Sequence, residues 1–256
     1  MTVPLADGLL ADFSADPLPT SVFGWGCENR ELELGGNATH FGFVFGGDAI
    51  LTTEHLNFSR EFSLGSGMYF SASGGAKLNG GTGVVVSRIG YRGVFLIGGP
   101  VEATGRLRYI DGCTASLLVP PVTKGDPCLN FLHFPPHVEQ TLHTHPSLRI
   151  CLVVRGRGRC TVPADPAGTG GEITLPLVPG RVMVIPADGP HRYCTDDESM
   201  DLISYHPDSD TGPEHQNHPV LNRTIVKGVS AAQLPNICNP IKGDQVISPV
   251  SGKRDH

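Results

Sequence analysis

Several features are scarce or missing in this sequence of 256 residues, and each absence excludes a class of protein. The 19 lysines and arginines, against 25 acidic residues, form no stripe of the kind that binds a phosphate backbone, so nucleic-acid binding is not expected. No stretch approaches the roughly 18 apolar residues that a membrane span needs. Residues 1–21 also lack the basic start of a signal peptide. We expect a cytoplasmic protein outside the membrane.

Cysteine is sparse and unpatterned. The seven cysteines are an odd number and include no CxxC pair, so neither a disulfide framework nor a zinc knuckle is predicted. Cys151 and Cys160 could face each other across a hairpin. Small buried thiols are the simpler interpretation, because free cysteine packs as a small apolar residue. We therefore expect reduced thiols.

Glycine and proline are abundant, with 33 and 22 residues, and they leave little room for long helices. Short runs of strand length, such as HFGFVFG, GVVVSRIGY and RVMVIPA, alternate with turns rich in Gly, Asn and Ser. No GxGxxG motif lies between a strand and a helix, so a nucleotide cradle is not indicated. The pattern predicts an all-β chain of one or two domains.

The rhythm of strands and turns occurs twice. Residues 20–104 and residues 105–212 look like two copies of one small β unit, preceded by a loose N-terminal arm. Residues 213–256 are rich in Pro, Asn and Lys, and we expect them to form a tail or a lid, with a short helix only at VSAAQL.

Three histidines are spaced like metal ligands. In LHTHPSLRICLVV, a strand would place His143 and His145 on one face, because side chains alternate along a strand. An isolated HxH pair is commonly a surface or core pair, but GRVMVIPADGPHRYC adds His191 after a strand and a tight turn. A metal that does chemistry needs at least three donors and open positions besides. We predict a metal site of His143, His145 and His191.

The first of these stretches resembles a motif of the cupin superfamily, G(x)5HxH(x)3-4E(x)6G. FPPHVEQTLHTHPSLRICLVVRG supplies His143 and His145 as the two histidines and Gly156 as the closing glycine. The second family motif, G(x)5PxG(x)2H, is similar to GRVMVIPADGPHRY, in which His191 is the third ligand and the spacing around Gly189 is slightly altered.

The resemblance implies a double-stranded β-helix, or jelly-roll barrel, with a metal in the mouth of the barrel. It covers residues 105–208 well and the first half only as a degenerate copy without HxH. It therefore suggests a bicupin of two tandem barrels, in which residues 20–104 carry no metal ligands and residues 105–212 bind the metal.

The glutamate of the first motif is replaced by Arg149. This residue shares the strand parity of both histidines and should point inward unless a bulge intervenes. A guanidinium cannot ligate a cation, but it can hold a carboxylate in a bidentate pair. The alternative for Arg149 is a salt bridge or an outward kink. An inward Arg149 predicts a small anionic substrate beside a three-histidine centre.

Cupins with three-histidine sites include thiol and diketone dioxygenases that use iron(II). The resemblance thus implies a mononuclear non-haem iron oxygenase that acts on a small anionic organic substrate with O2; Zn, Mn, Ni or Cu could replace Fe(II). Two alternatives stay open: a metal-dependent lyase or isomerase on the same site, and a non-enzymatic module that binds a small molecule. Edge strands of small barrels often pair, so we expect a homodimer.

Two further residues are candidates for catalysis. Tyr193 should share the face of His191 and could donate a hydrogen bond to substrate or bound oxygen, or could simply pack in the barrel. His206 could move a proton if SYHPDSDTGPEHQNHP forms a lid, in which His206 and Tyr205 would lie nearest the site. A second cation could bind in this stretch, at His206, Asp208, Asp210, Glu214, His215 and His218.

A fourth ligand to the metal is also conceivable. His133 and His137 precede the HxH pair and could reach the metal if the chain bends at Pro135 and Pro136. Glu139 is the only nearby carboxylate that could replace the missing glutamate. The sequence leaves these three possibilities open.

Overall fold

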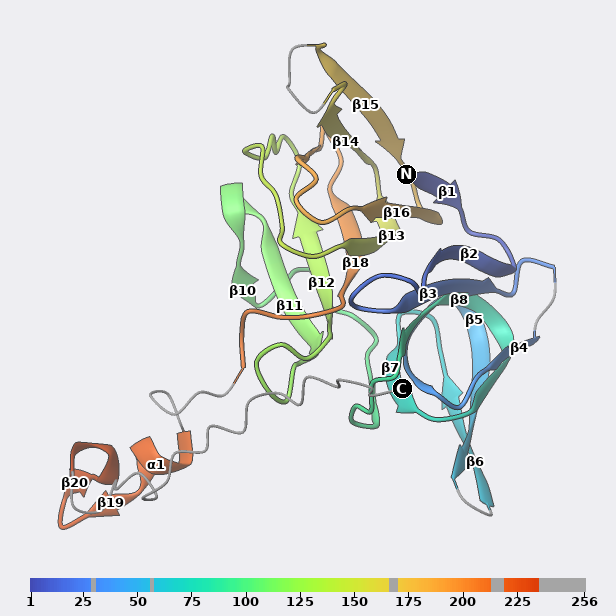
Figure 1. Ribbon diagram of the computed structural model, residues 1–256. Helices are drawn as coiled ribbons and strands as arrows, with labels where there is room; N and C mark the ends of the chain where they lie inside the picture. Colours follow the sequence, from blue (N-terminus) through green and yellow to red (C-terminus); the bar gives the residue numbers. More distant parts are fainter. Residues whose placement is uncertain (29–30, 56–57, 166–169, 213–218, 235–256) are drawn as a thin grey trace, which may run out of the picture.

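The structure is a computed structural model that describes residues 1–28, 31–55, 58–165, 170–212 and 219–234. It is nearly all β, as predicted, and its strands form two units side by side (Figure 1). The short elements α1 (Pro219–Arg223), β19 (Ile225–Val226) and β20 (Val229–Ser230) lie apart from both units, and the predicted helix at VSAAQL is a single 3-10 turn, Ala231–Gln233. In the described part of the chain, no helix is long and apolar enough to cross a membrane.

The N-terminal unit is one strongly curved sheet of eight strands. Its order is β2-β3-β8-β5-β7-β9, with β4 on β8 and β6 on β5. The strands are β2 (Gly8–Phe13), β3 (Thr20–Trp25), β4 (Glu31–Leu34), β5 (Ala38–His55), β6 (Phe58–Leu64), β7 (Tyr69–Ser73), β8 (Ala76–Ile89) and β9 (Leu96–Gly98). The long strands β5 and β8 bend where their register shifts at Gly46 and where Gly80 and Gly81 take positive φ, a conformation that glycine adopts without strain.

The C-terminal unit has two sheets, with strand orders β1-β16-β13-β18-β12-β11-β10 and β15-β14-β17. Its strands are β1 (Thr2–Pro4), β10 (Leu107–Arg108), β11 (Thr114–Val119), β12 (Cys128–Phe134), β13 (Arg149–Gly156), β14 (Gly158–Pro163), β15 (Glu172–Leu177), β16 (Arg181–Ile185), β17 (Arg192–Cys194) and β18 (Met200–His206). A 3-10 turn, Ile110–Gly112, connects β10 to β11.

The start of the chain is not the loose arm that we predicted. Strand β1 pairs with the edge of the C-terminal unit, with Thr2 opposite Met183 and Pro4 opposite Arg181. Strand β2 then opens the N-terminal sheet at Gly8, before the predicted boundary at residue 20. A strand of three residues shows no alternation in the sequence, and here its partner lies far along the chain, since Thr2 and Met183 are 181 residues apart.

Alternation along β13 determines which side chains enter the C-terminal barrel. Ile150 and Leu152 face the N-terminal unit and join the core between the two units. Cys151 and Val153 face the opposite way, into a core enclosed by the two sheets of the C-terminal unit. Because side chains alternate along a strand, Arg149 lies on the inner side with Cys151.

The interior of the N-terminal unit is apolar, with Trp25, Phe70 and Leu78 fully buried. His40 is buried in this unit, and its ring is satisfied by protein atoms: Nδ1 lies 2.8 Å from the hydroxyl of Ser87, and Nε2 lies 3.0 Å from the carbonyl oxygens of Gly35 and Gly74. The metal-ligand cluster found among the described residues lies in the other unit. That the chain is a bicupin stays a prediction.

We expect His40 to make folding stability pH-dependent. Burial lowers its pKa below the ordinary value of 6.5, so the folded chain keeps the ring neutral while the unfolded chain takes up a proton. Stability is then lost as the pH falls below about 6.5, by up to ~1.4 kcal/mol per pH unit from this one group. Urea unfolding of wild type and His40→Gln between pH 7 and pH 5 measures this, and the variant should show the shallower pH dependence. Parallel curves would contradict it.

Candidate metal centre

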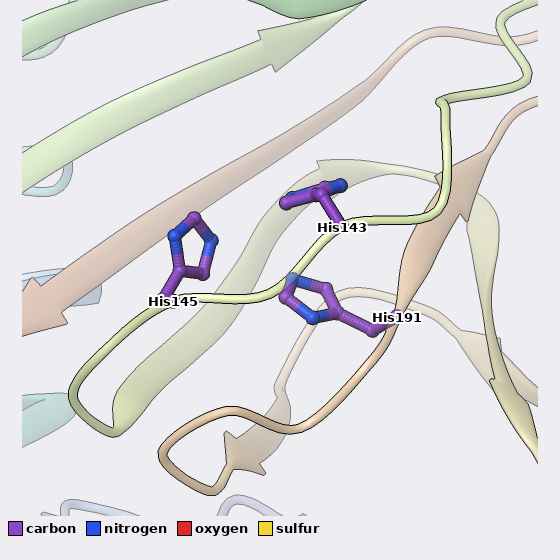
Figure 2. Close-up of side chains that lie close together, drawn as sticks. All are labelled: His143, His145 and His191. Atoms are coloured by element: carbon purple, nitrogen blue, oxygen red, sulfur yellow. The ribbon is translucent and has the colours of Figure 1, made fainter. Parts of the chain in front are cut away.

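Three histidine rings meet at one end of the C-terminal barrel (Figure 2). One ligand atom from each of His143, His145 and His191 lies within 4.8 Å of the other two. The ring centroids are 4.4 Å apart for His143 and His191, and 5.1 and 5.2 Å apart for the pairs that include His145. Figure 2 shows His143 and His145 on one segment of the chain and His191 on the segment beside it.

Backbone hydrogen bonds hold the two segments together. The amide of His143 donates to the carbonyl of His191 at 3.0 Å, and the amide of His191 donates back at 2.9 Å. The predicted strand across HxH is wrong in detail, because β13 begins only at Arg149. Pro146 follows His145 directly and has no amide hydrogen for a strand ladder. The carbonyl of His145 instead accepts from the amide of Asp188 at 2.7 Å.

The protonation of these rings suits a divalent metal. Nδ1 of His143 lies 2.8 Å from the carbonyl of Thr141, and Nδ1 of His191 lies 2.9 Å from that of Gly189. A neutral ring that donates from Nδ1 presents the Nε2 lone pair to a metal. Nε2 of His143 is buried and has no hydrogen-bond partner among the described residues. The donor set therefore fits a metal.

Burial keeps two of the three rings neutral. It lowers the pKa of His145 to about 3, with Arg149 and the other two rings adding to the effect. It also lowers the pKa of His191 to about 4, again with help from His143 and Arg149. Metal binding requires the unprotonated ring, so no proton has to be displaced from these two ligands at neutral pH.

Arg149 points into the barrel, as its parity predicts, and is 7% exposed. Its Nη1 atom donates to the carbonyl oxygens of Ser147 and Leu148, both at 3.1 Å, and to the Ser147 hydroxyl at 2.5 Å. The Ser147 hydroxyl in turn donates to the carboxylate of Asp208. Among the described residues, Nε of Arg149 has no partner. The guanidinium is thus held through Nη1, and its buried Nε–H is left unpaired.

A cavity of about 180 Å³ opens beside the histidines. Its lining includes His145, His191, Arg149, Tyr193 and His206. This volume is below the range of pockets that hold drug-sized ligands, so the cavity suits a small molecule. A ligand there would lie between the rings and the positive charge of Arg149.

Tyr193 and His206 both line this cavity, Tyr193 on the face of His191 as predicted. The Tyr193 ring packs at 5.6 Å from that of His191, and its hydroxyl donates to Sγ of Cys151 at 3.5 Å. His206 is the last residue of β18 and not part of a lid, with its ring 6.4 Å from that of His145. A direct hydrogen bond from Tyr193 to a substrate stays a prediction.

Two described residues of the predicted lid, Tyr205 and Asp210, do not line the cavity. Tyr205 has the opposite parity to His206 and is buried in the core between the two units, so its expected place near the metal is wrong. Asp208 supports Ser147, and Asp210 is exposed. Glu214, His215 and His218 lie outside the described residues. The second cation site stays a prediction.

The three alternative fourth ligands all have other partners. His133 pairs with Asp201 at 2.7 Å, on the outer side of β12. His137 is exposed, with Asp197 at 3.9 Å, and Glu139 pairs with Arg192 at 3.0 Å. None of the three belongs to the cluster of possible ligands among the described residues.

The thiols of Cys151 and Cys160 are both free and buried, as the simpler interpretation predicted. Sequence reasoning missed three residues that support the site: Ser147, Asp208 in this role, and Ser204, whose hydroxyl lies 3.2 Å from Nε2 of His206. Ser147 could have been found, because it stands between His145 and Arg149 with the same spacing of two. The contact from Ser147 to Asp208 joins residues 61 apart and has no signal in the sequence.

The chain matches no protein-family model and no curated protein. Solved structures are similar to it. A cupin 2 conserved barrel domain protein from Leptotrichia buccalis has a TM-score of 0.51 and 14% identity, over 80% of this chain and 87% of that one. A structure of Bacillus subtilis oxalate decarboxylase, a protein with Mn(II) centres, has a TM-score of 0.54 and 13% identity, over 88% of this chain and 79% of that one.

The chain has the cupin fold. This confirms the fold that the two sequence motifs implied. At 12 to 14% identity the similarity extends to the fold alone. The chemistry of this chain must therefore be argued from its own residues.

Proposed function

We propose that this cupin is a mononuclear non-haem metal oxygenase that acts on a small carboxylate. One observation carries the proposal: His145 and His191, two of the three clustered imidazoles, line one small cavity together with the buried Arg149. His143, His145 and His191 would hold iron(II), and Mn(II), Zn(II), Ni(II) or Cu(II) are the other options. Bound iron(II) supplies the binding and reduction of O2.

The protein residues supply the binding and orientation of the substrate. Nη1 of Arg149 is engaged by Ser147 and Leu148, so the Nε side of the guanidinium is the part that can receive a carboxylate. Asp208 balances the buried charge through Ser147 without occupying the free end. A carboxylate placed there lies in the same cavity as His145 and His191.

A metal-dependent lyase is the second candidate, and the fold similarity favours it. Bacillus subtilis oxalate decarboxylase is named for the removal of a carboxyl group and has Mn(II) centres. A carboxylate held by Arg149 beside a metal would serve such a reaction as well. This alternative predicts turnover that does not consume O2.

Oxygen uptake should distinguish the two. We expect the full chain, purified without oxygen and loaded with iron(II), to consume O2 with at least one small acid from a panel of thiols, diketones and aromatic carboxylates. The matched controls are His143→Ala, which removes a ligand, and His137→Ala, which changes an exposed histidine outside the cluster. Turnover with Zn(II) in the absence of O2 would support the lyase. A carboxylate that binds equally well after chelation of the metal, with no turnover, would support a binding module.

A further inference from the structure

Four side chains beside the metal cavity form a continuous chain of hydrogen bonds. The Tyr193 hydroxyl donates to Sγ of Cys151 at 3.5 Å. The Cys151 thiol donates to the hydroxyl of Ser204 at 3.4 Å, and Oγ of Ser204 lies 3.2 Å from Nε2 of His206. All four residues line the cavity that contains Arg149. The sequence motifs do not predict this series of hydrogen bonds.

The direction of these hydrogen bonds follows from the number of hydrogens that each side chain can donate. A phenol, a thiol and an alcohol each carry one hydrogen to donate. Tyr193 is 3% exposed, and within the described residues its hydroxyl donates to Cys151 alone. Reversing the direction of these hydrogen bonds would leave the buried phenolic hydrogen without an acceptor, which is unfavourable. Tyr193 therefore donates to Cys151, Cys151 to Ser204, and Ser204 to His206.

A ring nitrogen that accepts a hydrogen bond carries no hydrogen itself. Nε2 of His206 accepts from Ser204, so the hydrogen of the neutral ring lies on Nδ1. Burial, with contributions from Arg149 and His145, lowers the pKa of His206 well below its ordinary value, so the ring is neutral at pH 7. No described residue accepts a hydrogen bond from Nδ1 of His206.

We propose that the hydrogen bonds that link Tyr193, Cys151 and Ser204 fix His206 as the Nδ1–H tautomer. This tautomer donates a hydrogen bond to the small carboxylate bound at Arg149. The second half of this inference rests on the proposed function. The cavity would then offer the carboxylate two donors, Nε–H of Arg149 and Nδ1–H of His206. Ser204, Cys151 and Tyr193 act as positioning residues through His206.

The tautomer can be measured directly. In the full chain loaded with Zn(II) and labelled with 15N-histidine, long-range 1H–15N correlation separates a protonated from an unprotonated ring nitrogen, and His206→Gln assigns the signal. We expect Nδ1 of His206 to be protonated in wild type. Ser204→Ala removes the donor to Nε2, so both tautomers should be populated, whereas Ser204→Thr keeps a hydroxyl and should keep the wild-type pattern. A protonated Nε2 in wild type, or an unchanged pattern in Ser204→Ala, would overturn the inference.

Acetate is the probe for the donor role. Titrating acetate into the Zn(II)-loaded chain should shift the Nδ1 signal of His206, and His206→Phe should weaken acetate binding about 10-fold, the effect of losing one hydrogen bond to a charged group. Ser204→Ala should weaken it only about 2-fold, because roughly half of the molecules keep the competent tautomer. Acetate that binds without moving the His206 signal would overturn the donor role. The tautomer can also be read in the metal-free chain, so failure of the metal site and failure of this inference are separate results.

Discussion

Replacing His191 by alanine should lower the affinity of the chain for divalent metal by at least about 100-fold. Loss of a residue that only orients a ligand already lowers metal affinity 10- to 100-fold in other sites, and His191 is one of three direct ligand candidates. The two remaining rings, His143 and His145, come from one segment and leave the metal open on the side of β17. Competition titration with Co(II) or Zn(II), followed by elemental analysis, measures the effect.

The same variant should lose the stabilisation that metal gives to the folded state. A metal present at 100 times its dissociation constant stabilises the chain by about 2.7 kcal/mol, because it binds only the folded form. Wild type and His137→Ala should show this gain in thermal unfolding, and His191→Ala should not. Wild-type metal affinity in His191→Ala would show that the cluster is not the metal site. A large loss in His137→Ala, His133→Ala or Glu139→Ala would instead identify a fourth ligand.

Much of this site could be predicted because its residues obey a local rule. His143, His145, Arg149 and Cys151 are separated by multiples of two residues. This spacing places Arg149 and Cys151 on the inner side of the barrel, even though the strand begins only at Arg149. His191 follows a Pro and Gly turn after β16, where a change of chain direction is expected. Repeated short strands separated by turns were enough to predict an all-β fold.

The contacts that complete the site could not be predicted, because they join distant parts of the chain. The hydroxyl of Ser147 meets Asp208, and the hydroxyl of Tyr193 meets Cys151, across separations of 61 and 42 residues. Strand β1 likewise pairs with a strand that is distant in the sequence, β16. Alternation tells which side of a strand faces inward, but it does not tell which inward side chains meet.

The interaction of Arg149 with Ser147 explains why its free end is available. A buried arginine is commonly paired with a carboxylate, which would occupy the fork of the guanidinium. Here the hydroxyl of Ser147 lies between the carboxylate of Asp208 and the guanidinium. Burial lowers the pKa of Arg149, and Asp208 raises it. The charge is therefore only partly compensated inside the protein, and an anion in the cavity would complete the compensation.

Removing this charge should have the second large effect. Arg149→Ala should weaken acetate binding to the Zn(II)-loaded chain about 10- to 100-fold, because a hydrogen bond to a charged group contributes about 1.5–3 kcal/mol. Arg149→Lys keeps the charge but has no Nε–H at the same place, so an intermediate affinity is expected. Arg159→Ala is the control, since Arg159 lies on β14 and pairs with the exposed Asp196. Isothermal titration measures all four proteins, and an unchanged affinity in Arg149→Ala would exclude the anchoring role.

Arg149→Glu tests the other consequence of an arginine at the position of the motif glutamate. A carboxylate at this inward position offers the metal a fourth ligand and repels an anion in the cavity. We expect the absorption spectrum of bound Co(II) to change and acetate binding to be lost, with metal affinity at least as high as in wild type. Arg149→Gln has a similar length without the charge and should leave the Co(II) spectrum as it is in wild type. If Arg149→Glu leaves both the spectrum and acetate binding unchanged, the side chain at position 149 does not face the metal.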